Sequence, residues 1–454
     1  MRYISTRGKA KTLTFAEVVM TGVASDGGLY VPENLPKLSL EQIKKLKDLS
    51  YVDLAFEIIK LFIDDSISHS ELHELIKKSY KNFSDPDIAP LREINPGQYM
   101  LELFHGPTLS FKDFALQFLG NLFDYYLKKS HKKITIIGAT SGDTGSAAIE
   151  GCYKSKNIEL FILYPYERIS EVQRRQMTTI IADNVNVLAV KGNFDDCQNI
   201  VKELFQRDGN KYVAVNSINW CRIMAQIVYY FHAVLKLDAL EKEVVFSVPT
   251  GNFGDIYAGF VAKQMGLPIK KLVIATNAND ILHRFLTNND YSKETLKHTL
   301  SPSMDIQVSS NFERLLFNLH NNDGKLIADL MANFAKTGSL KIAPDKLVEA
   351  QEVFASGAAD DKLICETIAD IYKDTGLTID PHTATGFAAL NNLKFKVNCQ
   401  IILSTAHPAK FPEALTKAKI PAAPLPNFLK NLHSRPESEI IVDADIEKIL
   451  LIIS

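Results

Sequence analysis

Residues 132–152, KKITIIGATSGDTGSAAIEGC, predict the fold class of the chain. The stretch reads as a short buried strand, a glycine-rich loop and a helix that opens with small residues. The same order recurs at residues 185–205, 243–266, 271–280 and 398–411. Strands that alternate with helices predict an α/β fold with a largely parallel sheet. In such a sheet the ligand binds beyond the carboxyl ends of the strands, where these loops gather.

The residues before this pattern have a different period. Residues 40–62 and 71–80 carry apolar side chains at helical spacing, so we expect a mainly helical N-terminal domain over residues 1–95. Residues 83–99 contain three prolines and no helical period, which indicates a passage between domains. An α/β region then spans residues 96–454.

Composition narrows the class of protein. The hydrophobic fraction of 46% and the charged fraction of 23% are typical of a globular protein. A net charge of -2 argues against nucleic acid or an anionic membrane as a partner. We also expect no secretory signal and no membrane span, because no apolar run approaches about 20 residues. The five cysteines include no CxxC pair, which favours a reducing compartment and a cytoplasmic protein.

Two histidines at a metal-binding spacing were considered as zinc ligands. His69 and His73 stand four residues apart in a predicted helix, but Glu71 is displaced from its place in HExxH and no third ligand is evident. We therefore predict no metal site.

A lysine among aromatic residues is the first candidate for chemistry. Lys112 lies in FHGPTLSFKDFALQFLG, between Phe111 and Phe114. Burial there would disfavour its charged form and leave the amine usable as a nucleophile. The alternative is an ordinary lysine that faces solvent.

The loop ATSGDTG is the first candidate anion site. Its polar residues Thr140, Ser141, Asp143 and Thr144 lead into a predicted helix, where N–H groups and hydroxyls can bind a carboxylate or a phosphate. The loop is neither GxGxxG nor a P-loop. Taken alone, it could also be a simple helix cap.

The loop PTGNFGD is the second candidate. Gly251 and Gly254 would let the backbone approach a phosphate, and Asn252 adds a side-chain donor. A similar loop, KGNFDD at residues 191–196, lacks the second glycine, and we interpret it as a plain turn from strand to helix.

Two further loops add polar side chains. In LSTAHPAKF, the hydroxyl of Thr405 could bond a heteroaromatic nitrogen or cap the next turn. In VNSINWCRI, Asn216, Ser217 and Arg222 precede a helical run, and the planar fork of Arg222 suits an oxyanion. A buried lysine, a glycine loop, a second anion loop and a strand-end hydroxyl are together the parts of a pyridoxal phosphate enzyme.

The longer segments of the chain resemble one family. YISTRG, FHGPTLSFKDF, ATSGDTGSAA, NSINWCRI, VPTGNFGD, DPHTATG and LSTAHPAKF, in this order, resemble the threonine synthases. That family shares the pyridoxal-phosphate fold type of the tryptophan synthase β subunit. The resemblance implies two open, mainly parallel α/β subdomains.

The resemblance also implies roles for residues. Lys112 would bind pyridoxal 5'-phosphate through its amine, Thr405 would face the pyridine nitrogen, and the ATSGDTG loop would receive the substrate carboxylate. The cofactor phosphate would lie on Gly251, Asn252, Phe253, Gly254 and Asp255, and the substrate phosphate on Asn216, Ser217 and Arg222. We read His382, in DPHTATG, as ordering a helix start. QVSSNFER departs from the family, so we assign no substrate contact to residues 305–315.

The implied reaction converts O-phospho-L-homoserine and water to L-threonine and phosphate by γ-elimination and β-hydration. In it the freed Lys112 amine would take the α proton. Three alternatives stay open: a phospho-lyase of the same fold that releases 2-oxobutyrate, a nucleotide-binding α/β protein, and a non-catalytic relative. We expect a monomer or weak homo-oligomer.

Overall fold

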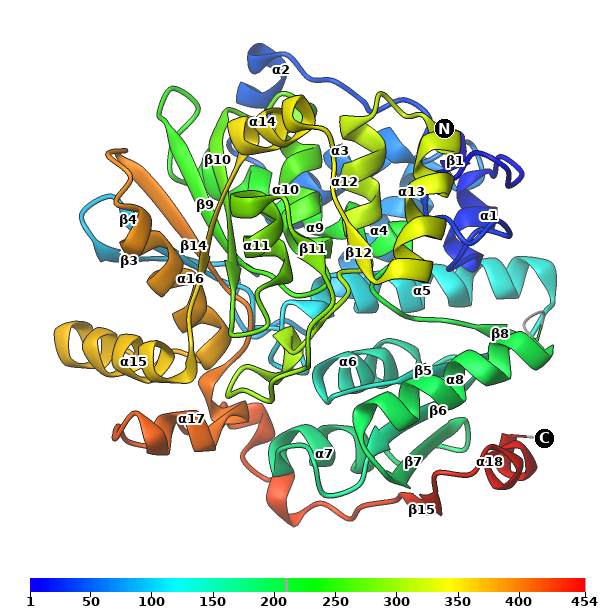
Figure 1. Ribbon diagram of the computed structural model, residues 1–454. Coiled ribbons are helices and arrows are strands. Elements are labelled where there is room, and N and C mark those ends of the chain that lie inside the picture. Colours follow the sequence, from blue (N-terminus) through cyan, green and yellow to red (C-terminus); the bar gives the residue numbers. More distant parts are fainter. Residues whose placement is uncertain (209–210, 454) are drawn as a thin grey trace.

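Two separate sheets organise the computed structural model, which describes residues 1–208 and 211–453 (Figure 1). The larger sheet has six strands, in the spatial order β13 (Phe354–Ala358), β10 (Ile269–Thr276), β9 (Val244–Pro249), β14 (Cys399–Ser404), β4 (Gln98–Glu102) and β3 (Leu91–Asn95). All neighbours run parallel except β3 and β4. The smaller sheet is parallel throughout, with the order β15 (Ile440–Asp443), β7 (Val185–Lys191), β6 (Ile158–Pro165), β5 (Ile134–Ala139) and β8 (Tyr212–Val213). The prediction of an α/β fold with parallel sheets is thus confirmed.

The central strands are parallel because both of their faces are covered. Every residue of β9 is buried, and β10 is buried over its last five residues, as expected for strands packed between helices. The helices that connect or cover the two sheets are α5 (Lys112–Ser130), α6 (Asp143–Cys152), α7 (Glu171–Thr178), α8 (Phe194–Asp208), α9 (Trp220–Lys236), α10 (Gly254–Gln264) and α16 (Pro381–Leu393). Helix α9 is buried along almost its whole length because α3, α5 and α10 pack against it.

The first 95 residues contain both helices and strands. The helical elements are α1 (Phe15–Met20), α2 (Leu40–Lys44), α3 (Tyr51–Ile59), η1 (Lys60–Phe62) and α4 (His69–Tyr80). Four of them begin at a Ser or Thr whose side chain accepts the N–H three residues on, which explains where they start. An antiparallel pair, β1 (Tyr3–Ser5) and β2 (Tyr30–Pro32), and strand β3 lie in the same region. The mainly helical domain and its boundary at residue 95 stay predictions.

The rest of the chain frames the larger sheet and then crosses to the smaller one. Its elements are α11 (Ile281–Asn288), β11 (Tyr291–Ser292), η2 (Pro302–Met304), α12 (Phe312–Leu319), α13 (Gly324–Thr337), β12 (Ser339–Leu340), α14 (Pro344–Val353), α15 (Asp361–Thr375), η3 (Pro408–Lys410), α17 (Pro412–Lys417), η4 (Asn427–Leu429), η5 (Leu432–Ser434) and α18 (Ile446–Ile453). After α17 the chain runs along the outside of the smaller sheet and adds β15 to its edge (Figure 1). Among the helices described, none has the length and apolar character that crossing a membrane requires.

Candidate active site

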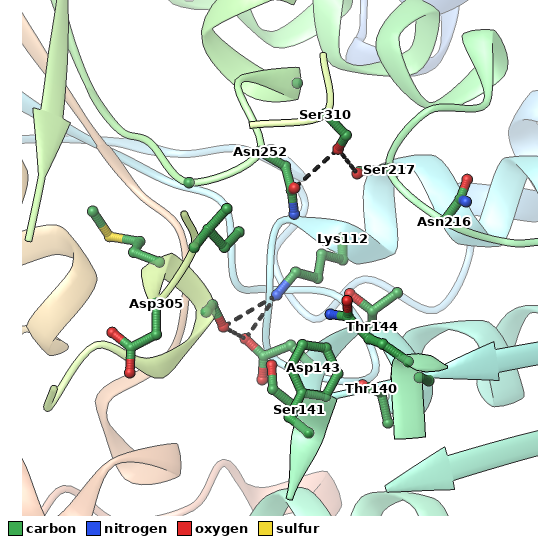
Figure 2. Close-up of a pocket in the computed structure, with 18 of the residues that line it drawn as sticks. Lys112, Thr140, Ser141, Asp143, Thr144, Asn216, Ser217, Asn252, Asp305 and Ser310 are labelled. Carbon is green, nitrogen blue, oxygen red and sulfur yellow. Dashed lines mark hydrogen bonds and ion pairs between the residues drawn. The ribbon is translucent and has the colours of Figure 1, made fainter. Parts of the chain in front are cut away.

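One cavity of about 830 Å³ collects the loops that follow strands of both sheets. The loops after β5 and β8 of the smaller sheet and after β9 and β14 of the larger sheet all line it. This agrees with the rule that ligands of parallel sheets lie beyond the carboxyl strand ends. All four loops that the sequence singled out therefore meet at one place, and Figure 2 shows side chains from the loops after β5, β8 and β9 around Lys112.

Lys112 is the first residue of α5 and points its amine into the cavity (Figure 2). Its side chain is 10% exposed, and Nζ lies 3.3 Å from Oδ2 of Asp143 and 3.4 Å from Oγ of Ser303. Burial lowers the pKa of Lys112, and Asp143 opposes this shift. The amine thus loses its proton more easily than that of an exposed lysine.

The loop after β5 is held by its own threonine. Oγ1 of Thr140 accepts the N–H groups of Gly142 (3.0 Å) and Gly145 (2.9 Å). Ser141 and Thr144 are half-buried and line the cavity. The loop therefore combines a structural hydroxyl, at Thr140, with two hydroxyls at the cavity wall.

Asp143 is a buried carboxylate between two lysines. Oδ2 faces Lys112, while Oδ1 lies 2.7 Å from Nζ of Lys410 and accepts Nε2 of Gln173 at 2.8 Å. Burial alone would raise the pKa of Asp143, but Lys112 and Lys410 hold it well below its usual range. Asp143 is therefore ionised, and its charge is balanced inside the protein.

The loop after β9 leaves a helix start open. Phe253 adopts a left-handed conformation with φ of 62°, and α10 begins at Gly254 with no side-chain cap among the residues described. A Cβ on Gly251 would lie 3.0 Å from Cδ1 of Ile306 and 3.1 Å from the carbonyl of Ser303, so only glycine fits without displacement. The first N–H groups of α10 can therefore receive an anion.

Two side chains of this loop are fixed by hydrogen bonds. Oδ1 of Asn252 accepts Oγ of Ser310 at 2.9 Å, and Ser310 in turn lies 3.2 Å from Oγ of Ser217 (Figure 2). Asp255 is buried and accepts the hydroxyls of Tyr229 (2.5 Å) and Tyr230 (3.0 Å). Burial raises the pKa of Asp255 to about 6.

Arg222 brings a second positive group to the cavity. It is 3% exposed, lines the cavity with Asn216 and Ser217, and donates from Nη1 to the carbonyl of Val215 at 3.2 Å. Its Nε has no hydrogen-bond partner within the described part of the chain. Burial lowers the pKa of Arg222 to about 10, so the side chain is still charged near neutral pH. An unpaired buried donor of this kind can bind an oxyanion.

Thr405 and His382 lie on the side of the larger sheet. Thr405 follows β14, and its carbonyl accepts the N–H of Phe111 at 2.9 Å, which ties this loop to the approach of Lys112. Asp380, rather than His382, caps α16 through the N–H groups of His382 and Thr383. His382 lies 2.8 Å from Asp380 through Nδ1, and its Nε2 accepts the N–H of Ser303 at 3.3 Å.

One wall of the cavity was missed by the sequence analysis. Residues 302–308 and Ser310 line the cavity, although no contact was assigned to residues 305–315. Oγ of Ser309 donates to the carbonyl of Gly251 at 2.6 Å, and Nδ2 of Asn311 donates to the carbonyl of Asn252 at 3.0 Å. The segment supports the loop after β9 through backbone carbonyls, and the run of small polar residues was its only signal.

No cluster of His, Cys, Asp and Glu within residues 1–208 and 211–453 is arranged to hold a metal ion. Of the histidine pair considered above, His73 lies 2.9 Å from Asp53, and both rings pack on Phe56.

Known proteins resemble this chain over its whole length. The family described as "Threonine synthase N terminus" matches residues 2–80, "Pyridoxal-phosphate dependent enzyme" matches residues 94–333, and "Threonine synthase, C-terminal" matches residues 383–453. A threonine synthase from Pseudomonas aeruginosa is 52% identical and aligns over 100% of this chain and 98% of its own length.

Two solved structures have the same fold. The pyridoxal-phosphate-bound threonine synthase from Brucella melitensis superimposes with a TM-score of 0.96 at 43% identity, over 100% of this chain and 98% of the other. The threonine synthase from yeast superimposes with a TM-score of 0.94 at 41% identity, with the same coverage.

Proposed function

Since this chain belongs to the threonine synthase family, we propose that it converts O-phospho-L-homoserine and water to L-threonine and phosphate. Its fold is the α/β fold of pyridoxal-phosphate-dependent enzymes, and its cofactor is pyridoxal 5'-phosphate. One observation carries the assignment of residues. Lys112, the residues at the open start of α10 and Arg222 belong to the lining of a single cavity.

The cavity suits the cofactor. Lys112 offers an amine for covalent attachment, and the start of α10 offers backbone donors to a phosphate. We assign the cofactor phosphate to residues Gly251, Asn252, Phe253, Gly254 and Asp255, and we assign the ring nitrogen to the hydroxyl of Thr405. Bound pyridoxal phosphate supplies a ring that spreads the negative charge formed at the substrate α carbon.

Lys112 acts in this proposal as the base. Nζ takes the proton from the substrate α carbon, which its lowered pKa supports because a larger share of the amine is unprotonated near neutral pH. Ser303 and Asp143 hold Nζ beside the cavity.

The two ends of the substrate lie on different loops. The loop of Thr140, Ser141, Asp143 and Thr144 receives the carboxylate through the N–H groups and hydroxyls at the start of α6. The substrate phosphate is held by Asn216, Ser217 and Arg222 until it leaves. Arg222 suits this role because its Nε has no hydrogen-bond partner among the described residues and its buried positive charge favours a nearby anion. The distance between these loops sets the length of substrate that fits.

The proposal also covers the domain boundaries, the oligomeric state and the cellular location. We propose a mainly helical domain over residues 1–95 ahead of a catalytic region over residues 96–454, a monomer or weak homo-oligomer, and a cytoplasmic location. Limited proteolysis tests the boundary, and sedimentation equilibrium tests the oligomeric state.

The absorption spectrum of the purified protein tests the assignment of Lys112. We expect a band at about 410–420 nm from the covalently bound cofactor, and borohydride reduction should fix the cofactor to the Lys112 peptide. Label on another lysine contradicts the assignment. Product analysis then separates the reaction from its alternative, because threonine supports the proposal whereas 2-oxobutyrate indicates a phospho-lyase.

A further inference from the structure

A second buried lysine lies behind the cavity wall. Lys410, at the end of η3, is fully buried, although the family motif LSTAHPAKF had drawn attention only to Thr405. Its Nζ lies 2.7 Å from Oδ1 of Asp143 and donates to the carbonyl of Thr108 at 2.7 Å. A lysine is rarely buried completely unless it is paired. Asp143 is the carboxylate that pairs with it.

The carboxylate of Asp143 is divided between two sets of partners. Oδ2 meets Lys112 at 3.3 Å and Ser303 at 3.5 Å, and both of these side chains line the cavity. Oδ1 meets Lys410 and Gln173, which approach from η3 and α7 behind the wall. Oδ2 thus faces side chains that line the cavity, whereas Oδ1 is held by side chains outside the cavity lining.

This division matters because the charge of Lys112 changes during the reaction. Attachment of the cofactor would leave Nζ of Lys112 with at most one N–H group, so Asp143 would lose hydrogen bonding from that side. A buried carboxylate without a partner takes up a proton or moves. Lys410 does not line the cavity and meets the other oxygen of Asp143, so its own contact with Asp143 is neither made nor broken by a bond formed at Lys112.

We propose that Lys410 is a positioning residue that keeps Asp143 ionised and in place whether or not the Lys112 amine is free. The proposal rests on the proposed function in one respect, the attachment of the cofactor to Lys112.

Asp113 and His407 are the other titratable groups that act on Lys410, and of the two carboxylates only Asp143 forms an ion pair with it among the described residues. Burial raises the pKa of Asp113 to about 6, against two hydrogen bonds from Thr108. Burial lowers the pKa of His407 to about 4, so this ring is neutral near pH 7. Arg222 is a further cation that acts on Lys112. Asp143 is therefore the carboxylate that directly contacts Lys410.

The first test uses protein freed of cofactor. Labelling with acetic anhydride across a pH series, with mapping of the Lys112 peptide, gives the pH at which this amine becomes reactive. Lys410→Met removes a neighbouring cation and leaves Lys112 as the one lysine that pairs with Asp143 among the described residues. Both changes favour the ammonium, so the midpoint should rise by about one pH unit.

Lys417→Met is the matched control, because Lys417 is an exposed lysine of α17 paired with Glu413. In Lys417→Met the midpoint for labelling of Lys112 should equal that in the unchanged protein. An unchanged midpoint in folded Lys410→Met overturns the proposal. This test needs no bound cofactor, so its result is independent of whether Lys112 carries the cofactor.

The second test is a double-mutant cycle with Asp143→Asn, read as the affinity for pyridoxal phosphate. Lys410→Met should weaken the affinity about tenfold in the original protein, where it strands a carboxylate, and far less in Asp143→Asn. Equal weakening in both backgrounds shows that Lys410 acts through Thr108 and overturns the proposal. If Lys410→Met fails to fold, recovery of folding in the double variant supports the proposal, whereas failure of both variants overturns it. Borohydride label on a lysine other than Lys112 would instead overturn the proposed function.

Discussion

The tripeptide Gly-Asn-Phe occurs in two loops of this chain, and the helix starts that follow them differ. In the loop before α8, Asn193 and Asp196 bond each other reciprocally, with the N–H of Asn193 on Oδ2 of Asp196 at 2.7 Å and the N–H of Asp196 on Oδ1 of Asn193 at 3.0 Å. The loop before α10 has the same spacing of Asn252 and Asp255, but this pair is not used as a cap among the residues described.

The difference comes from the two residues in between. Phe194 is already the first residue of α8, and Asp195 follows it. Phe253 turns left-handed, and Gly254 follows it, so Asp255 is directed toward Tyr229 and Tyr230. A helix start binds an anion only if its own side chains leave the N–H groups free. Phe253 and Gly254 therefore separate the loop to which we assign the cofactor phosphate from the capped turn before α8.

Removing the amine separates attachment from retention of the cofactor. In Lys112→Ala we expect turnover to fall by about 10⁴-fold or more, because the base and the attachment point are lost together. The loop of Gly251 should still hold the cofactor phosphate. Equilibrium dialysis should find cofactor that exchanges freely, with nothing fixed by borohydride. Complete loss of binding would mean that the open helix start holds little of the cofactor.

Filling the two loops with the same side chain tests the comparison directly. Gly251→Val should weaken cofactor affinity about a hundredfold, because its Cβ meets residues 303–306 and would displace the loop to which we assign the phosphate. Gly192→Val is the matched control. There the Cβ meets Oδ2 of Asp196 at 2.6 Å, so stability should fall while the cofactor titration is unchanged. Equal cofactor affinity in both variants would place the phosphate elsewhere.

Arg222 is a side chain with a free hydrogen-bond donor, as the start of α10 is a stretch of backbone with free donors. Its Nε has no hydrogen-bond partner among the described residues. Arg222→Met should lower kcat/KM for O-phospho-L-homoserine by about tenfold to a hundredfold and leave the cofactor spectrum unaltered. Homoserine, which lacks the phosphate, is the control ligand, and its weak binding should hardly respond. If both ligands bind more weakly to the same extent, Arg222 has a structural role.

Asp255 and Asp196, the acids of the two loops, differ in their environment. For Asp255 this predicts that the free energy of unfolding depends on pH. Because the folded-state pKa of Asp255 is raised to about 6, the folded protein disfavours its ionised form. The penalty is absent below the unfolded value of 3.8 and complete above the folded value. Asp255→Asn should therefore stabilise the protein by about 3 kcal/mol at pH 8 and by less than about 1 kcal/mol at pH 4. Thermal melts at both pH values measure this, with Asp196→Asn as the control. A gain that does not depend on pH would argue against a buried carboxylate.

The smallest effect concerns the closed loop. Asn193→Ala removes the acceptor for the N–H of Asp196 and should cost about 1 kcal/mol of stability. Urea unfolding measures the loss, and cofactor affinity should not change. A loss of affinity would show that the loop before α8 also takes part in binding.

The sequence was informative where the signal is local. Buried apolar runs gave the strands, and the four loops that end them meet in the cavity as expected. The partners of strands were not predictable, because the pattern of one strand does not specify its neighbour. Thus β4 and β14, about 300 residues apart, lie side by side, and β3 joins the larger sheet across the boundary predicted at residue 95.

The missed residues had long-range partners too. Ser309 and Asn311 donate hydrogen bonds to backbone carbonyls of the loop after β9. Because every residue has a backbone carbonyl, nothing in the sequence indicates which ones these side chains bind. Lys410 is one of 51 lysines and arginines in the sequence, and its contact with Asp143 is visible only in the folded structure.

The pairing of β4 with β14 also fixes when the site can exist during protein synthesis. At about 5–20 residues per second, the roughly 300 residues between these strands take about 15 to 60 seconds to translate. Lys112 leaves the ribosome early, whereas Thr405 and Lys410 follow only after β14. A nascent chain therefore carries the reactive amine through most of its translation without the walls that enclose it. A chain stalled before β14 lacks the strand that pairs with β4 and the wall that Thr405 contributes to the cavity.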